Sequence, residues 1–323
     1  MSRVTIKPSV KDSLIFNEYK FSSDIALAMS TNKDILVDIG LEGPDLKLTN
    51  FYDILEYNSK LFNYDIGRID LITQNVLERS KKINIHYLPP LHFSPSYKPQ
   101  NSNIIKKKFN HFGIFVGRNN GPRLMLSSHI NNLNKNNIQT FHFNVDEDFD
   151  RANLALDELF FILNKKNIES EVSFINCCPI KYEKMDEYPI PEDAVYDGLE
   201  ETYEDFFVEI VCESFYNGET FFPTEKIWRP MFFRTPFIVQ GPSNYLSNLH
   251  RLGFKTFHEF WNEEYDEEPY PTKLNKIVDV IDYINSKTKD ELNTMYENMQ
   301  DILDHNQKLV MKLQKQDFKI FYE

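Results

Sequence analysis

The stretch GETFFPTEKIWRPMFFRTPFIVQG, from Gly218 to Gly241, contains the pattern that decides the fold class. Thr224 is a suitable helix N-cap, which places Glu225 and Lys226 in the first turn of a helix. The run TPFIVQG, residues 235–241, is short, apolar and ended by glycine, as in a buried strand of a parallel sheet. The stretch therefore predicts a helix followed by a buried strand, with a charged pair at the helix start.

The charged pair allows two interpretations. Glu225 and Lys226 could be a solvated first turn of a surface helix. They could also bind a nucleotide sugar, because the free N–H groups of a helix start attract anions and the Lys226 ammonium adds a charge for a phosphate. The Glu225 carboxylate would then accept hydrogen bonds from a ribose diol. From Thr224, Glu225 and Lys226 alone, the capped surface helix is the favoured interpretation.

Working outward, strands alternate with helices on both sides of this stretch. FFVEIVCE, residues 206–213, reads as a strand that ends at Glu213, and SNYLSNLHRLG, residues 243–253, as a helix with Gly253 as a usual C-cap residue. Further strands are predicted at 34–40, 67–75, 82–89, 112–116 and 138–145, and further helices at 50–65, 123–133 and 151–166. This alternation predicts α/β domains with parallel sheets, whose ligands bind at the carboxyl ends of the strands.

The length of 323 residues suggests two domains. PPLHFSPSYKPQNSN, residues 89–103, is rich in Pro, Ser and Asn and is interpreted as the linker. We therefore expect an acceptor-side domain at 1–105 and a donor-binding domain at 106–323. The second domain is expected to end in a helical tail, in which Thr288 and Glu291 fit a capping box.

Composition limits the classes of partner. A formal net charge of −13 argues against general nucleic-acid binding, which needs a basic face. Three cysteines without regular spacing predict neither a disulfide framework nor a structural zinc site. Neither a signal peptide nor an apolar run long enough for a membrane span is found, and we expect a soluble, cytoplasmic protein.

The second half of the chain resembles the donor-binding region of family 10 glycosyltransferases, the α-1,3/4-fucosyltransferases, and especially their viral and bacterial relatives. The family signature reads Glu-Asn-Ser, then Tyr-Val-Thr-Glu-Lys. The matching residues of this chain are Glu213-Ser214, Thr224-Glu225-Lys226, Trp228, Pro230, Thr235-Pro236-Phe237-Ile238, Gly241, Leu252-Gly253-Phe254-Lys255-Thr256-Phe257 and Tyr265-Asp266. The resemblance extends from Phe112 to about Asn306.

The resemblance implies a GT-B fold, with two Rossmann-like domains, and transfer of a sugar from a nucleotide-diphosphate donor, possibly GDP-linked, to an acceptor hydroxyl. Glu225 would bind the ribose and Lys226 and Arg123 the diphosphate, while Glu213 would shape the sugar pocket. Arg118 follows a strand and a glycine, where a side chain facing phosphate and an ordinary surface loop are equally reasonable. With cations on the leaving diphosphate, neither a catalytic metal nor another cofactor is expected.

Two departures from the signature leave the sugar open. Phe222 stands where the family has tyrosine, and Ser214 where it has asparagine. The catalytic base is also open: Glu42 and Asp45 follow the strand predicted at 34–40 and are the candidates. For both, a turn carboxylate that binds nearby backbone is the competing interpretation.

Three alternative functions remain. Asp146 and Asp148 have the Asp-x-Asp spacing of metal-dependent transferases, although a loop explains them as well. The two departures would also suit a degenerate GT-B fold that acts as a binding or scaffold protein. A glycosyltransferase that modifies DNA bases is the third alternative, and the negative charge argues against it.

Overall fold

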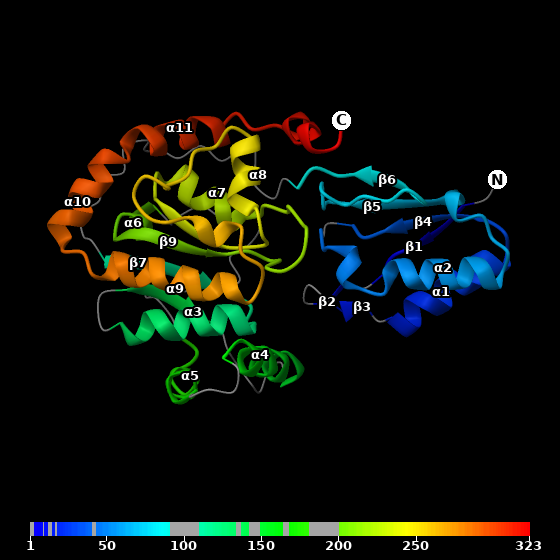
Figure 1. The fold of residues 1–323 in the computed structure, drawn as a ribbon, viewed down its shortest axis with the longest axis horizontal. Helices are drawn as coiled ribbons and strands as arrows, with labels where there is room; N and C mark the ends of the chain where they lie inside the picture. Colours follow the sequence, from blue (N-terminus) through cyan, green and yellow to red (C-terminus); the bar gives the residue numbers. More distant parts are fainter. Residues whose placement is uncertain are drawn as a thin grey trace. The chain divides into compact units, whose positions relative to one another are not determined.

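The computed structural model describes residues 3–8, 10–11, 15–16, 18–40, 43–90, 110–133, 137–141, 149–163, 168–180 and 200–323. The fold is α/β, as predicted, and the chain divides into two compact units (Figure 1). Unit 1 comprises Met1–His92, Ser214–Thr224 and Gln314–Glu323. Unit 2 comprises Phe93–Glu213 and Glu225–Leu313.

Unit 1 contains a four-stranded parallel sheet in the order β1-β4-β5-β6. Its strands are β1 (Arg3–Ile6), β4 (Asp34–Asp38), β5 (Ile69–Thr73) and β6 (Asn84–Tyr87), and a separate antiparallel pair is formed by β2 (Val10–Lys11) and β3 (Ile15–Phe16). Helices α1 (Glu18–Ser30) and α2 (Phe51–Leu61) pack side by side against the sheet (Figure 1). The short 3-10 helices η1 (Leu46–Leu48) and η2 (Ile66–Arg68) lie on either side of α2 in the chain.

The core of unit 1 follows from the sequence pattern. Alternate residues of β4 and β5 are buried, and α2 turns one apolar face inward. The fully buried members of this cluster are Ile25, Ile35, Val37, Leu46, Phe51, Leu55, Ile69 and Leu71.

Unit 2 contains a second four-stranded parallel sheet, in the order β10-β9-β7-β8. Its strands are β7 (Asn110–Val116), β8 (Ile138–Phe141), β9 (Phe206–Cys212) and β10 (Phe237–Gln240). Every residue of β9 and β10 is buried. Continuous apolar runs are typical of parallel strands that are covered on both faces, and this is why they could be located from the sequence.

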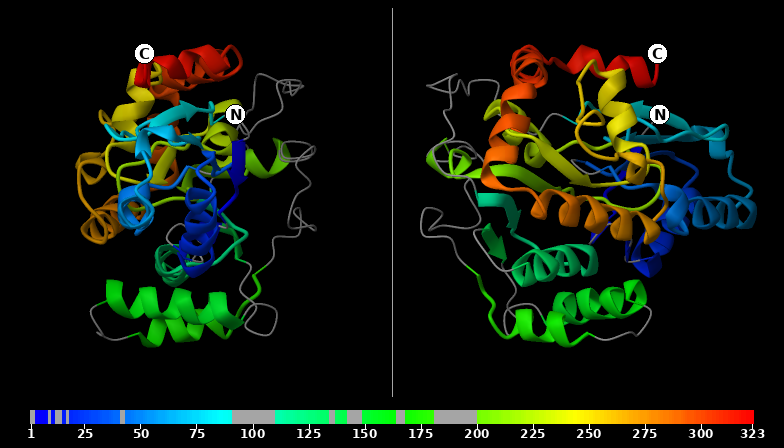
Figure 2. Two further views of the ribbon diagram at one scale, coloured as in Figure 1. Left: turned by 90° about the vertical axis from the view of Figure 1, so that its right-hand side faces the viewer. Right: turned by 60° about the vertical axis from the view of Figure 1, so that its left-hand side comes forward.

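Helices cover both faces of this sheet (Figure 1). One face carries α3 (Gly121–Asn132) and α9 (Thr272–Asn285), and the other carries α7 (Glu225–Phe232), α8 (Tyr245–Arg251) and α11 (Gln300–Val310). Outside α3 lie α4 (Phe149–Ile162) and α5 (Glu169–Ile175), as Figure 2 shows. The remaining elements are α6 (Glu200–Tyr203), η4 (Glu264–Asp266) and α10 (Lys289–Asn298).

The C-terminal tail is helical, as predicted, but it is not one helix. Thr288 and Glu291 form the predicted capping box at the start of α10. The chain then breaks at Met299, which is both the C-cap of α10 and the N-cap of α11. The helical spacing of apolar residues continues from α10 into α11, so the sequence pattern did not indicate the break at Met299.

Unit 1 also contains two segments from far along the chain. In Ser214–Thr224, the backbone N–H of Glu219 donates to Asp45 Oδ2 over 2.7 Å and the Thr220 hydroxyl donates to the Gly43 carbonyl. In Gln314–Glu323, which includes η5 (Lys315–Phe321), the ring of Tyr322 stacks on Tyr87 at 4.6 Å between centroids. The predicted boundaries, 1–105 and 106–323, assigned both of these segments to the second domain, whereas the structure has them in unit 1. Residues 91–109, which contain the predicted boundary, lie outside the described part of the chain.

Among the helices of the described residues, none has both the length and the apolar character needed to cross a bilayer.

Candidate functional site

The strand order of unit 2 defines the place where a ligand is expected. From β7 the chain moves to β8 on one side, and it later returns to β9 on the other side of β7. The carboxyl ends of β7 and β9 therefore form a topological switch point, where open α/β sheets bind ligands. In unit 1 the main strands follow one another in a single direction, so that sheet has no such reversal.

Arg123, in the first turn of α3, spans the switch point. Its Nη1 donates to the carbonyl of Arg118 over 2.7 Å, and its Nη2 donates to the carbonyls of Cys212 and Glu213 over 3.1 and 2.6 Å. Its side chain is buried, and these bonds tie the ends of β7 and β9 together. The contact with phosphate predicted for Arg123 would require these backbone bonds to be exchanged.

The N-terminus of α3 is already satisfied by the protein. Asn120 is the N-cap and its Oδ1 accepts from the backbone N–H of Arg123, while the N–H of Gly121 donates to Glu158 Oε2 over 2.8 Å. Pro122 has no N–H to offer. The loop before α3 contributes other groups: Arg118 is exposed, and the Oδ1 atom of buried Asn119 has no hydrogen-bond partner among the described residues.

Glu213 directly follows β9 and is buried, with 1% of its surface exposed. Its Oε1 accepts a hydrogen bond from the Tyr245 hydroxyl over 2.6 Å. Burial and the Glu213 carboxylate both hold the pKa of Tyr245 well above its usual value, so this phenol stays protonated and donates. Tyr245 was not among the predicted site residues, because its ring fits the apolar spacing of the helix predicted at 243–253.

Glu225 and Lys226 begin α7, as predicted, and form an ion pair. Lys226 Nζ lies 2.8 Å from Glu225 Oε1. Burial alone would raise the pKa of the Glu225 carboxyl, but the positive charges of Lys226 and Arg229 outweigh burial and bring this pKa to about 2. Glu225 is therefore a carboxylate at neutral pH and can accept hydrogen bonds from hydroxyl groups.

The charged residues at the switch point all affect the pKa of one thiol group, that of Cys212. Burial raises the pKa of the Cys212 thiol, at the end of β9, to about 12. Arg123 and Lys226 oppose this rise, while Glu213 adds to it. These charges are therefore close enough to interact at the carboxyl end of β9.

Three further predicted residues are Glu42, Asp45 and Thr224. Glu42 lies outside the described residues. Asp45 is buried in unit 1, where Oδ1 accepts from the backbone N–H of Lys47 and Oδ2 from that of Glu219, so it has the turn-carboxylate contacts of the competing interpretation. Thr224 is buried and directly precedes α7, at the point where the chain passes from unit 1 to unit 2.

Unit 1 contains a buried carboxyl group that the sequence did not indicate. Glu78 Oε1 accepts from the Tyr52 hydroxyl over 2.8 Å, and Oε2 accepts from the N–H of Leu46 over 3.1 Å. Burial raises the pKa of Glu78 above its ordinary value, against the lowering effect of these hydrogen bonds. With 1% of its surface exposed, Glu78 is placed to support η1 rather than to meet a substrate.

Metal ligands do not gather in the described part of the chain: no group of three or more His, Cys, Asp or Glu side chains there could hold an ion. Asp146 and Asp148 lie outside the described residues. Comparisons with protein-family models, with curated proteins and with solved structures find no match to this chain.

Proposed function

We propose that this protein is a glycosyltransferase of the GT-B type that binds a nucleotide-diphosphate sugar at the switch point of unit 2. The observation that carries this proposal is the ion pair Glu225–Lys226 in the first turn of α7, beside the carboxyl end of β9. A carboxylate and an ammonium on one helix start match the two polar parts of such a donor, its ribose diol and its diphosphate.

The proposed roles follow from which groups are available. Lys226 moves from Glu225 to the diphosphate, and exposed Arg118 adds a second cation. Glu225, freed from its partner, accepts hydrogen bonds from the ribose. Arg123 acts as a positioning residue, because it fixes the ends of β7 and β9. Glu213 and Tyr245 are buried and hydrogen-bonded to each other, so they shape the sugar side of the site from behind its surface.

A binding protein without transferase activity is the second candidate function. This second candidate is favoured by the contacts of Asp45, one of the two residues predicted as the catalytic base. Asp45 is buried and accepts hydrogen bonds from two backbone N–H groups, so its carboxylate has little freedom to take a proton from an acceptor hydroxyl. Such a protein would still bind the nucleotide at the switch point but would release no free nucleotide from a sugar donor.

Calorimetric titration with GDP, UDP, CMP and their sugar conjugates tests the proposal. One nucleotide should bind, and Lys226→Ala should weaken it about tenfold or more, because a hydrogen bond between charged groups contributes about 1.5–3 kcal/mol. Lys289→Ala, an exposed lysine at the start of α10, is the matched control and should change nothing.

Failure of every nucleotide to bind, or equal binding by the Lys226→Ala variant, would reject the donor site. Nucleotide release from the bound sugar donor, assayed with and without EDTA, then separates a transferase from a binding protein. Loss of that release in EDTA would favour the metal-dependent alternative.

A further inference from the structure

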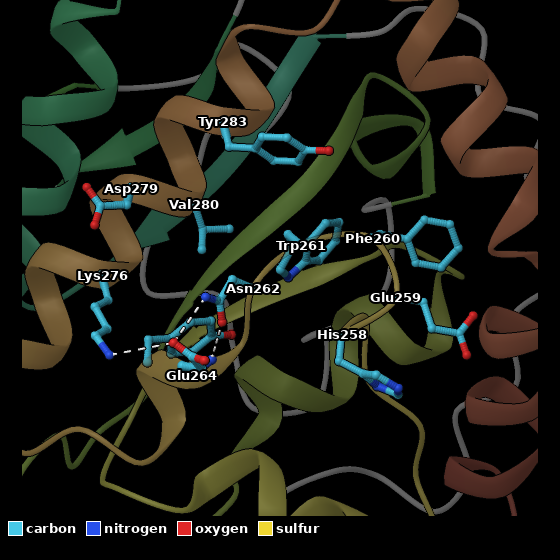
Figure 3. A pocket seen from close by; sticks show the side chains of 11 residues that line it. His258, Glu259, Phe260, Trp261, Asn262, Glu264, Lys276, Asp279, Val280 and Tyr283 are labelled. Carbon is cyan, nitrogen blue, oxygen red and sulfur yellow. Dashed lines mark hydrogen bonds and ion pairs between the residues drawn. The ribbon is translucent and has the colours of Figure 1, made fainter.

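Unit 2 contains a cavity that shares no residue with the switch-point site. Its volume is about 510 Å³, within the range of small-molecule sites. One wall comes from the loop at 258–265 and the other from α9, as Figure 3 shows. A shallower hollow continues from it past Glu259, Phe260 and Tyr283.

Aromatic side chains dominate the lining of this cavity. They are Phe260, Trp261, Tyr265 and Tyr283. Tyr283 is 43% exposed although it is a large ring on a helix. Trp261 is buried, and its indole N–H has no hydrogen-bond acceptor among the described residues. Because buried donors are normally paired, a ligand that offers an oxygen atom would satisfy this one.

The charged side chains of the cavity disfavour anionic ligands, because three carboxylates line it together with one lysine, Lys276, and one histidine, His258. Glu259, Glu264 and Asp279 line it, and all three are exposed. Within the described ranges, no hydrogen bond or ion pair involves the side chain of Glu259 or of Asp279, so their carboxylates are available as acceptors. A phosphate or a carboxylate ligand would be repelled, which separates this cavity from the proposed diphosphate site.

Two lysines of the chain disfavour a cationic ligand. Lys276 Nζ lies 2.6 Å from Glu268 and 3.9 Å from Glu264, at the edge of the cavity (Figure 3). The Lys287 ammonium lies 4.3 Å from the centroid of the Tyr283 ring and so occupies the cation position on that ring. An organic cation would have to displace or oppose these charges, and it would leave the Trp261 N–H without an acceptor.

We propose that this cavity binds a neutral saccharide. Sugar rings present apolar C–H faces, which suit the aromatic rings, and hydroxyl groups that donate to Glu259 and Asp279 and accept from the Trp261 N–H. The inference depends on the lining of the cavity and not on the proposed transferase activity. If both hold, the cavity is a second carbohydrate site of unit 2, apart from the donor.

The loop that forms one wall is fixed by the protein before any ligand arrives. Glu263 accepts from the Thr256 hydroxyl over 2.5 Å and from the Phe257 backbone N–H over 2.9 Å. Asn306, from α11, exchanges two hydrogen bonds with the backbone of Lys255. A pre-formed wall lowers the entropic cost of binding a weak ligand.

Saturation-transfer NMR with lactose, maltose, cellobiose and diacetylchitobiose on the full chain tests this inference. At least one disaccharide should bind. Binding should change the tryptophan fluorescence, because Trp261, one of the two tryptophans of the chain, lines the cavity. Tyr283→Ala and Asp279→Asn should each weaken binding about five- to tenfold. Tyr57→Ala, an exposed tyrosine of α2, is the matched control and should leave binding unchanged.

Absence of binding by all four disaccharides would overturn the inference. So would binding that survives both substitutions with its affinity intact, or a higher affinity for tetramethylammonium than for any sugar. Lys226→Ala should bind the disaccharide as well as wild type does. Disaccharide binding by wild type without binding of any nucleotide would reject the donor site alone, whereas loss of nucleotide binding only in Lys226→Ala would support that site.

Discussion

Replacing Asp45 by alanine distinguishes a structural carboxylate from a catalytic one. In the structure Asp45 closes a local turn through the N–H of Lys47, over 2.9 Å, and also holds the N–H of Glu219, 174 residues away, over 2.7 Å. The substitution removes both bonds of this buried side chain and leaves the N–H groups of Lys47 and Glu219 without their acceptor. We therefore expect Asp45→Ala to destabilise unit 1.

Asp65 provides the matched comparison, because it makes the same local turn and, within the described residues, its side chain has no hydrogen bond to a distant part of the chain. Its side chain accepts from the N–H of Gly67 over 3.0 Å, and the residue is exposed. Loss of such a cap costs about 1 kcal/mol. Asp45→Ala loses in addition a hydrogen bond to a charged group, about 1.5–3 kcal/mol, so its expected total is about 2.5–4 kcal/mol.

The two units can be followed separately in a urea titration. Both tryptophans, Trp228 and Trp261, belong to unit 2, so tryptophan fluorescence reports that unit, whereas far-UV circular dichroism reports both. Asp45→Ala should move the dichroism transition to lower urea and leave the fluorescence transition in place. A loss no larger than that of Asp65→Ala would refute the structural role. Normal stability combined with lost transfer activity would instead restore the catalytic interpretation.

Two more predictions concern Gly218, within the segment Ser214–Thr224, and Glu225, the residue directly after that segment. Gly218 has φ +80°, and a Cβ there would meet Asp45 Oδ2 and Leu48 Cδ1 at 2.6 Å, so Gly218→Ala should lower the stability of unit 1 by about 1–3 kcal/mol in the same urea assay. Unchanged stability would show that the segment is not held against Asp45. The pKa of Glu225 is lowered from 4.5 to about 2, so its ionised form adds stability above pH 4.5, and this is lost as the pH falls toward 2. The stability difference between wild type and Glu225→Gln should narrow over that range in calorimetry, and a difference independent of pH would contradict the ion pair.

The fold class and most strands could be predicted because their signal is local. The runs at β4, β5, β7 and β9 are apolar and short, and each is followed by glycine or polar residues. The capping box of Thr288 and Glu291 is likewise complete within four residues. Such patterns need no knowledge of the rest of the chain.

The returns of the chain to unit 1 could not be predicted, because nothing local encodes them. The contact between Asp45 and Glu219 joins two ordinary polar residues, and only the folded backbone brings them together. The same holds for the site. Arg123 was identified as a cation, but its burial against three carbonyl groups depends on the spacing of β7 and β9. A sequence shows which side chains could bind phosphate, but it does not show which of them already donate hydrogen bonds to backbone carbonyl groups in the folded protein.

The interleaved division of the chain has a consequence for synthesis. Unit 1 contains residues 1–92, which are made before unit 2, but it is completed by Ser214–Thr224 and Gln314–Glu323, which are made later. Arg79, for example, donates to the carbonyl of Phe321, 242 positions later. Unit 1 therefore cannot be complete until residues 314–323 have been made, which is after all of unit 2 has been translated. Deletion of residues 314–323 would therefore remove contacts from unit 1 and leave the contacts within unit 2 in place.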